Sequence, residues 1–150
     1  MSYIPEWVSA IAATVTAVGV LFAFQQFRLS KKIAQVQFED GLAKEYRDIA
    51  GTILTKAMLG EGLSDTEYQE SFGKLFRYID LTNEQVSLRQ RGRISEEVWW
   101  YWLAGIKANI RLPAFSRAWT EIKDKSESFR ELRRLEDEDF ATDPKKWSDY

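Results

Sequence analysis

The stretch WVSAIAATVTAVGVLFAF, residues 7–24, decides the fold class of this chain because it runs for 18 residues without a charge. Residues 25–27 extend the uncharged run, whose hydroxyl side chains are Ser9, Thr14 and Thr16. At about 1.5 Å per residue, a helix of 18–21 residues covers about 27–31 Å, which is the thickness of the bilayer hydrocarbon. The sequence therefore predicts a transmembrane helix over about residues 7–27.

The charges on either side of this run predict its orientation. No Lys or Arg precedes Arg28, whereas Arg28, Lys31 and Lys32 follow the run within five positions. Cations gather on the cytoplasmic side of membrane helices. We therefore expect the N-terminus to lie outside the cell and residues 28–150 to lie in the cytoplasm.

Two other structures compete with a membrane span for an apolar run of this length. A cleaved signal peptide normally begins with cations and ends at a small-residue site, but here the cations come after the run. A core helix normally has a polar face, whereas this run is apolar on every side. A membrane span remains the prediction.

The segment after the run continues in a helical pattern. No Pro interrupts the chain between Glu6 and Arg111. Apolar side chains recur every three or four positions, at Phe38, Leu42, Tyr46, Ile49, Ile53 and Ala57. We expect the membrane helix to continue into this segment, with Gly41 or Gly51 as points where it can bend.

Capping signals divide the rest of the chain into further helices. Ser64 and Glu67 are spaced as a capping box, which predicts a helix over residues 65–91. Within that helix Leu81 and Leu88 lie off the main apolar stripe, so its C-terminal half is expected to pack on two sides.

Two more helices are predicted beyond this point. Gly92 suits a helix C-cap and Ser95 an N-cap, which predicts a helix over residues 96–111. Pro113 suits the first position of a fifth helix that ends near residue 137. The fold class is therefore all-α, with one N-terminal transmembrane helix and a cytoplasmic bundle of about four helices.

The predicted domains are an anchor (residues 1–32), a helical bundle (33–137) and a polar, acidic tail (138–150). The composition of the tail favours a flexible segment. Its isolated aromatic residues are Phe140, Trp147 and Tyr150. These leave open a second possibility, in which the tail docks on the body of the protein or on a partner.

The segment EVWWYWLAG, residues 97–105, holds four consecutive aromatic residues. Helical spacing places Trp99 and Trp102 on the main apolar face, where we expect core packing. The other side consists of Tyr101 with the small residues Ala104, Gly105 and Ala108, and we expect a neighbouring helix to approach closely there. Trp100 lies apart from both and is a candidate contact residue.

An arginine-rich turn suggests a binding site for an anion. The forked guanidinium group suits phosphate, and an exposed Trp can stack on a base. The predicted ligand is an anionic nucleotide, and the candidate residues are Arg89, Arg91, Arg93, Trp100, Lys107 and Arg111. The alternative is a solvated turn in which the arginines pair with Glu96 and Glu97.

The residue types present argue against most catalytic chemistry. The chain has no Cys and no His, which removes thiol nucleophiles, disulfides and imidazole acid–base chemistry. Its carboxylates form no convincing pair across an apolar helix face. We therefore expect no enzymatic activity, metal site or cofactor, and the net charge of −2 argues against duplex nucleic acid as a partner.

Small residues recur along the predicted span. Ser9, Ala13 and Ala17 are four positions apart, as are Gly19 and Ala23. Small residues at this spacing let helices pack closely in lipid, and Thr14, Thr16, Gln25 and Gln26 can hydrogen-bond across such an interface. We expect self-association or a membrane-protein partner; the alternative is a plain anchor.

Four segments give the chain its resemblance to other proteins: FQQFRLSKK (24–32), LFRYIDLTNEQVSL (75–88), RGRISEEVWWYWLAGI (91–106) and LPAFSRAW (112–119). In these the chain resembles uncharacterised small bacterial membrane proteins with one N-terminal span and a helical cytoplasmic domain of unknown function. The resemblance implies a fold, a topology and an address in the bacterial inner membrane. It carries no functional residues.

Two functions suit these features. The first is a non-enzymatic adaptor or accessory subunit, anchored in membrane lipid and serving a partner complex. The alternative is a ligand-gated oligomeric membrane effector of the bacterial defence type, which senses an anionic nucleotide second messenger.

Overall fold

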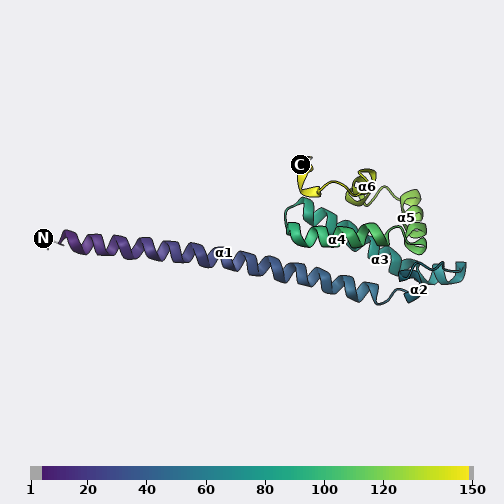
Figure 1. Cartoon of the computed structure of the whole chain (residues 1–150), viewed down its shortest axis with the longest axis horizontal. Helices are drawn as coiled ribbons and strands as arrows, with labels where there is room; N and C mark the ends of the chain where they lie inside the picture. Colours follow the sequence, from purple (N-terminus) through teal and green to yellow (C-terminus); the bar gives the residue numbers. More distant parts are fainter. Residues whose placement is uncertain (1–4, 149–150) are drawn as a thin grey trace. The chain divides into compact units, whose positions relative to one another are not determined.

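The computed structural model describes residues 5–148 and shows helices without a β-strand in that range (Figure 1). In chain order these are α1 (Glu6–Ala50), α2 (Thr55–Met58), α3 (Asp65–Gln90), α4 (Glu96–Asn109), α5 (Pro113–Lys125), α6 (Arg130–Asp137) and a 3₁₀ turn η1 (Pro144–Lys146). The all-α prediction is confirmed. The chain divides into two units, one ending at Phe38 and the other beginning at Glu39.

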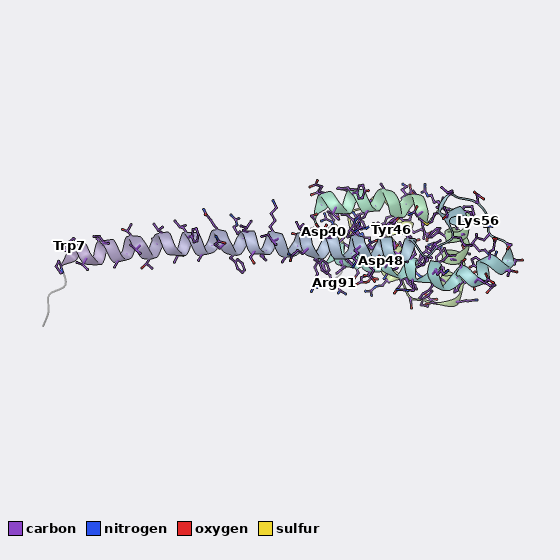
Figure 2. The ribbon with its side chains drawn as sticks, turned by 90° about the horizontal axis from the view of Figure 1, so that it is seen from below. Trp7, Asp40, Tyr46, Asp48, Lys56 and Arg91 are labelled. Atoms are coloured by element: carbon purple, nitrogen blue, oxygen red, sulfur yellow. The ribbon has the colours of Figure 1, made fainter. Side chains whose placement is uncertain are left out.

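The first unit contains the N-terminal part of α1, which is long and apolar enough to cross a membrane by length and composition. Every side chain from Ala10 to Ala34 is exposed, and side chains project on all sides of the helix (Figure 2). The hydroxyls of Thr14 and Thr16 donate to carbonyls one turn earlier, at 2.9 and 2.8 Å. These hydroxyls therefore satisfy their donors inside the helix, which suits a lipid environment.

The second unit begins within the same helix. Leu42 and Ile49 are buried, and α1 passes Gly41 without interruption. It ends at Ala50, where the backbone N–H of Gly51 donates to the carbonyl of Arg47 at 2.9 Å. The predicted continuation of the membrane helix is therefore confirmed as far as Ala50, and Ala57 of the predicted stripe lies in the separate helix α2.

The capping box predicted for α3 is confirmed. The Ser64 hydroxyl accepts from the Glu67 backbone N–H at 3.3 Å, and the Glu67 carboxylate accepts from the Ser64 N–H at 2.8 Å. Lys56 of α2 lies 2.6 Å from the same carboxylate. The hydrogen bond from Lys56 is the main cause that lowers the pKa of Glu67 to about 2, and the hydrogen bonds from Ser64 add to it.

The core of the second unit is built around α3, which packs against α5, α6 and η1. Leu81 and Leu88 are buried on the second side, as predicted, and the main stripe buries Leu75, Ile79 and Val86 completely. Because α3 is apolar on two sides, it can hold later helices on both. The helix end predicted at Gly92 is also confirmed, since this residue takes a left-handed φ of 69° directly after Arg91, the C-cap of α3.

The prediction of one helix from Pro113 to about residue 137 is wrong, because the chain breaks between α5 and α6. Phe129 has a left-handed φ of 65° and is buried, with its ring edge-on to Phe76 and Trp119 at centroid distances of 5.5 and 6.1 Å. The Arg133 guanidinium donates to the carbonyls of Ser126 and Ser128 in the break and to that of Lys123 in the last turn of α5. Burial of the Phe129 ring and the hydrogen bonds from Arg133 stabilise this turn. The spacing of apolar residues in the sequence does not predict it.

The tail docks on the body of the second unit instead of remaining flexible. Phe140, Asp143 and Pro144 are buried. Trp147 is partly buried, donates to a Glu138 carboxylate oxygen at 2.9 Å, and lies under the Arg134 guanidinium at 4.6 Å. Of the two possibilities left open by the sequence, docking on the body holds as far as Trp147, and Tyr150 lies outside the described residues.

The four aromatics of α4 separate as helical geometry predicts. Trp99 is fully buried and Trp102 is partly buried against the core. Tyr101 is 81% exposed, and the small residues Ala104, Gly105 and Ala108 beside it are exposed too. The expected close approach of a neighbouring helix to this side is therefore wrong within the described chain.

Candidate functional site

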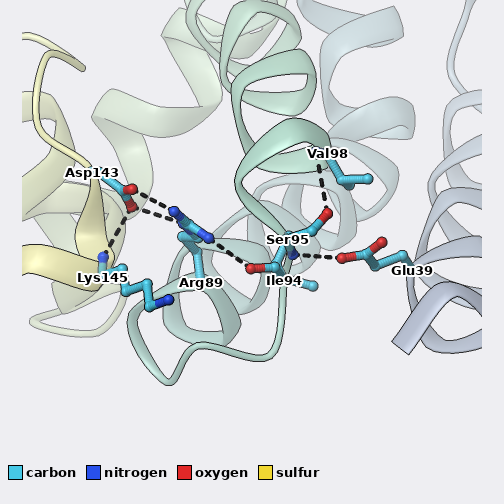
Figure 3. A network of polar contacts seen from close by, with 7 residues as sticks. All are labelled: Glu39, Arg89, Ile94, Ser95, Val98, Asp143 and Lys145. Carbon is cyan, nitrogen blue, oxygen red and sulfur yellow. Dashed lines mark hydrogen bonds and ion pairs between the residues drawn. The ribbon is translucent and has the colours of Figure 1, made fainter. Parts of the chain in front are cut away.

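Arg89, the first residue of the predicted anion site, is buried and already has partners (Figure 3). Its Nε and Nη2 donate to the two carboxylate oxygens of Asp143 at 2.8 and 2.5 Å, and its Nη1 donates to the Ile94 carbonyl at 2.7 Å. This bidentate geometry is the one in which a guanidinium binds phosphate. Since Asp143 fills it, Arg89 is not available to a ligand.

The partner of Arg89 is held by several donors. Burial acts to raise the pKa of Asp143, but hydrogen bonds from Arg89 and from the Lys145 backbone N–H outweigh it, so the pKa lies below its ordinary value. Lys145 N–H donates to Asp143 at 3.1 Å, which makes Asp143 the cap of η1. The pair thereby ties the tail to the end of α3.

Arg91 and Arg93 remain exposed, and the tail brings a third cation, Lys145, toward them, with the exposed Lys146 next to it in the chain. The Lys145 Cε lies 3.8 Å from the position of a β-carbon on Gly92, between the two arginines. We call Arg91, Arg93, Lys145 and Lys146 the basic surface. No ion pair joins its members to Glu96, Glu97 or any other residue from 5 to 148. Of the alternative, a solvated turn, the exposure of Arg91 and Arg93 therefore holds, but their expected pairing with Glu96 and Glu97 does not.

Lys107 and Arg111 lie at the other end of α4, where both contact the exposed Asp139. Arg111 donates to its carboxylate at 3.0 Å, and Lys107 donates to its carbonyl at 3.0 Å. Trp100 is 45% exposed on the same helix. Ser95 and Lys107 are separated by about 18 Å of helix at 1.5 Å per residue. The six predicted residues therefore do not form one site.

Glu39 positions the α3–α4 turn, and sequence reasoning missed it. Its carboxylate accepts from the backbone N–H of Ser95, the N-cap of α4, at 2.5 Å (Figure 3). Glu39 is the first residue of the second unit, so the turn that carries Arg91 and Arg93 lies where α1 enters that unit. No sequence signal marks Glu39, whereas Asp143 before Pro144 matches the N-cap and first position of a helical turn.

The predicted packing residues of the span lie on α1. Ala13, Ala17, Gly19 and Ala23 are exposed, and a β-carbon on Gly19 would meet no atom within 4 Å. Ser9 belongs to the same helix, but its side chain lies outside the described set. These residues are therefore accessible to a partner helix.

No protein-family model matches the chain, and comparison with curated proteins and with solved structures gives no match either.

Proposed function

We propose that this chain is a non-enzymatic, single-pass membrane protein that acts as an anchored adaptor or accessory subunit for a partner complex. The exposed apolar part of α1 is the observation that supports this most. The hydrophobic core of the second unit begins at Leu42, so it includes no residue of the first unit. Lipid is the environment that fits the length and composition of this segment.

In this proposal the N-terminus faces outward, and the helical bundle lies on the cytoplasmic side of a bacterial inner membrane. The end of the span supports this orientation. Arg28 lies 5.1 Å from the ring centroid of Phe24, and Lys31 lies 5.9 Å from that of Phe27. Cations gather on the cytoplasmic side of a membrane helix, and their long side chains can lie along apolar groups at the interface.

The absence of cysteine from the sequence allows a direct test of this topology. In intact cells a membrane-impermeant maleimide should label Ser2→Cys and leave Ser148→Cys unlabelled, and both should react after permeabilisation. Labelling of Ser148→Cys in intact cells would contradict the orientation. Recovery of the protein in the soluble fraction would contradict the anchor.

The basic surface supports an acidic partner. Its four cations are exposed, and no residue from 5 to 148 forms an ion pair with them, so they are available to carboxylates of another protein. Exchange of Arg91 and Arg93 for Glu should abolish co-purification of that partner in mild detergent. The matched control exchanges Lys74 and Arg77, two exposed cations of α3, for Glu. Purification of the native protein without any partner would contradict the adaptor function.

The ligand-gated oligomeric effector remains a second candidate, with an anionic nucleotide second messenger as its ligand. Arg89 is buried against Asp143, so it no longer supports a nucleotide site. The exposed small residues of α1 still favour self-association. Gly19→Leu with Ala23→Leu should reduce crosslinking between copies in membranes, whereas Val20→Leu should not. Equal crosslinking of all three proteins would remove this candidate.

A further inference from the structure

A groove of about 420 Å³ lies in the second unit, beside the exposed side of α4. Its volume falls within the usual range for small-molecule sites, about 300–1,000 Å³. Three helices line it: α1 contributes Tyr46 and Arg47, α3 contributes Tyr78 and Gln85, and α4 contributes Tyr101 and Trp102. The groove is distinct from the basic surface.

The walls of the groove are aromatic. The rings of Tyr46 and Tyr78 have centroids 5.7 Å apart and an angle of 60° between their planes. Across from them Tyr101 is largely exposed, and the neighbouring Ala104 and Gly105 leave open space. A flat ring can therefore contact several aromatic faces without displacing a side chain.

Gln85 is the unusual polar residue of this groove. It is only 3% exposed, yet its side chain forms no hydrogen bond with any residue from 5 to 148. By contrast Thr82, on the same helix and also buried, donates to the Tyr78 carbonyl at 2.9 Å. Its amide atoms are not among the fully buried polar atoms that lack a partner in the described chain, which belong to Gln90, Trp99 and Trp119, so the Gln85 amide reaches the solvent in the groove. Because Gln85 lines the groove, a ligand with both a donor and an acceptor on one edge would satisfy it.

The hydroxyl groups of Tyr46 and Tyr78 share one hydrogen-bond partner. The Asn109 side-chain amide donates to the hydroxyl oxygens of both Tyr78 and Tyr46, at 2.7 and 3.3 Å. Each hydroxyl therefore keeps its own proton, and only one of these protons can be donated from one phenol to the other. Burial raises the pKa of Tyr78, which keeps it protonated at neutral pH. Asn109 therefore fixes the positions of the two rings that line the groove.

Arg47 sets the charge that the groove prefers. Its side chain is exposed and forms no ion pair with any described residue. The residues that line the groove include no carboxylate. The groove therefore favours a ligand with a negative charge and disfavours a metal ion.

We propose that this groove binds a small, planar aromatic anion. The ring lies against the tyrosines and Trp102, its hydrogen-bonding edge meets the Gln85 amide, and its negative group meets Arg47. Purine nucleotides and heteroaromatic carboxylates share this chemistry. The site goes beyond the adaptor function, which does not depend on a ligand.

Calorimetry on the full-length protein in lipid nanodiscs tests this site. The anionic probes are AMP and indole-3-acetate, and the neutral counterparts are adenosine and indole-3-acetamide. We expect at least one anion to bind about tenfold more tightly than its neutral counterpart, as a charge-assisted hydrogen bond predicts. Tighter binding of AMP would indicate a nucleotide ligand, and tighter binding of indole-3-acetate would indicate a carboxylate ligand.

Substitutions on α1 and α3 locate the binding. Arg47→Gln should abolish the preference for the anion, while the control Lys44→Gln, on the same helix but facing a different hollow, should retain it. Gln85→Leu should weaken binding at least tenfold without lowering thermal stability, because the lost amide makes no hydrogen bond to any described residue. A lower thermal stability of the Gln85→Leu protein would indicate that Gln85 supports the fold and does not bind a ligand.

Two results would overturn the proposal. One is that none of the four probes binds at concentrations up to about 10 mM, which would mean a binding free energy weaker than about −3 kcal/mol. The other is equal binding to the Arg47→Gln and Lys44→Gln proteins, since the anion would then be held elsewhere.

Discussion

The first part of α1 and the whole of α3 are both long helices rich in apolar residues, yet they differ in exposure. Val15 and Phe22 of α1 are 66% and 63% exposed, whereas Leu75 and Ile79 of α3 are fully buried. In α3 the apolar residues share the helix with charged ones, and protein packs on the apolar sides. In the first part of α1 they occupy every side, so lipid can surround it. The apolar content of a helix predicts that its side chains leave water. Whether the apolar residues occupy every side or only some sides predicts whether lipid or protein covers them.

Removal of residues 1–38 should break this comparison most completely. Because the core begins at Leu42, we expect the remaining chain to become soluble and to keep a cooperative thermal transition within a few degrees. Fractionation and circular dichroism measure the two effects. Removal of residues 139–150, which takes Phe140 and Asp143 from the fold, should destabilise the protein strongly. An unfolded 39–150 fragment would show that the first unit supports the second.

Substitution of Arg89 sharpens the contrast between buried and exposed positions. Arg89→Met leaves Asp143 buried without its partner, and the expected loss is about 3–5 kcal/mol in the free energy of unfolding. Arg91→Met, two residues later and exposed, should change it by about 0.5 kcal/mol or less. Urea denaturation compares the two. Addition of Asp143→Leu to Arg89→Met should restore part of the loss, and failure to do so would argue against this pair.

Acid should weaken the same contact. The pKa of Asp143 is lowered in the folded protein, so its contribution to stability is present above the ordinary pKa of 3.8. This contribution is lost as the pH falls through 3.8 toward the lower folded value. We expect urea midpoints of the native protein to drop between about pH 5 and pH 2 more steeply than those of Asp143→Asn. Parallel pH profiles would contradict the role of this carboxylate.

The smallest effect concerns the start of α3. Ser64→Ala removes the capping hydroxyl and should lower the free energy of unfolding by about 1 kcal/mol. Thermal denaturation of the 39–150 fragment would resolve this change. Ser148→Ala provides the control, because Ser148 is exposed, lies outside any helix and has a side chain without a hydrogen bond to a described residue. An equal loss in both variants would show that the capping box is not responsible.

Much of the helical framework could be predicted because its signals are local. Ser64 with Glu67, Gly92, Ser95 and Pro113 mark helix ends through contacts within a few residues, and the structure confirms each of them. The break between α5 and α6 was missed because it depends on Phe76 and Trp119, which are distant in sequence from Phe129. Helical periodicity carries no information about such contacts.

The candidate sites show the same limit. A run of arginines predicts a positive turn, but only the folded chain reveals that Asp143 neutralises Arg89 across 54 positions. The groove depends on Arg47, Gln85 and Trp102, from three different helices, and no motif links them. Polar residues at separate positions become a site only when packing brings them together.

The sequence by itself determined the helical class, the helix ends and the presence of one segment suited to a membrane. These depend on composition and on contacts between near neighbours along the chain, which a sequence records directly. Tertiary structure alone decided that the tail docks, that Arg89 is occupied and that Gln85 faces a groove without a partner. Those outcomes depend on which distant side chains share a small volume, because hydrogen bonds and packing act over only a few ångströms.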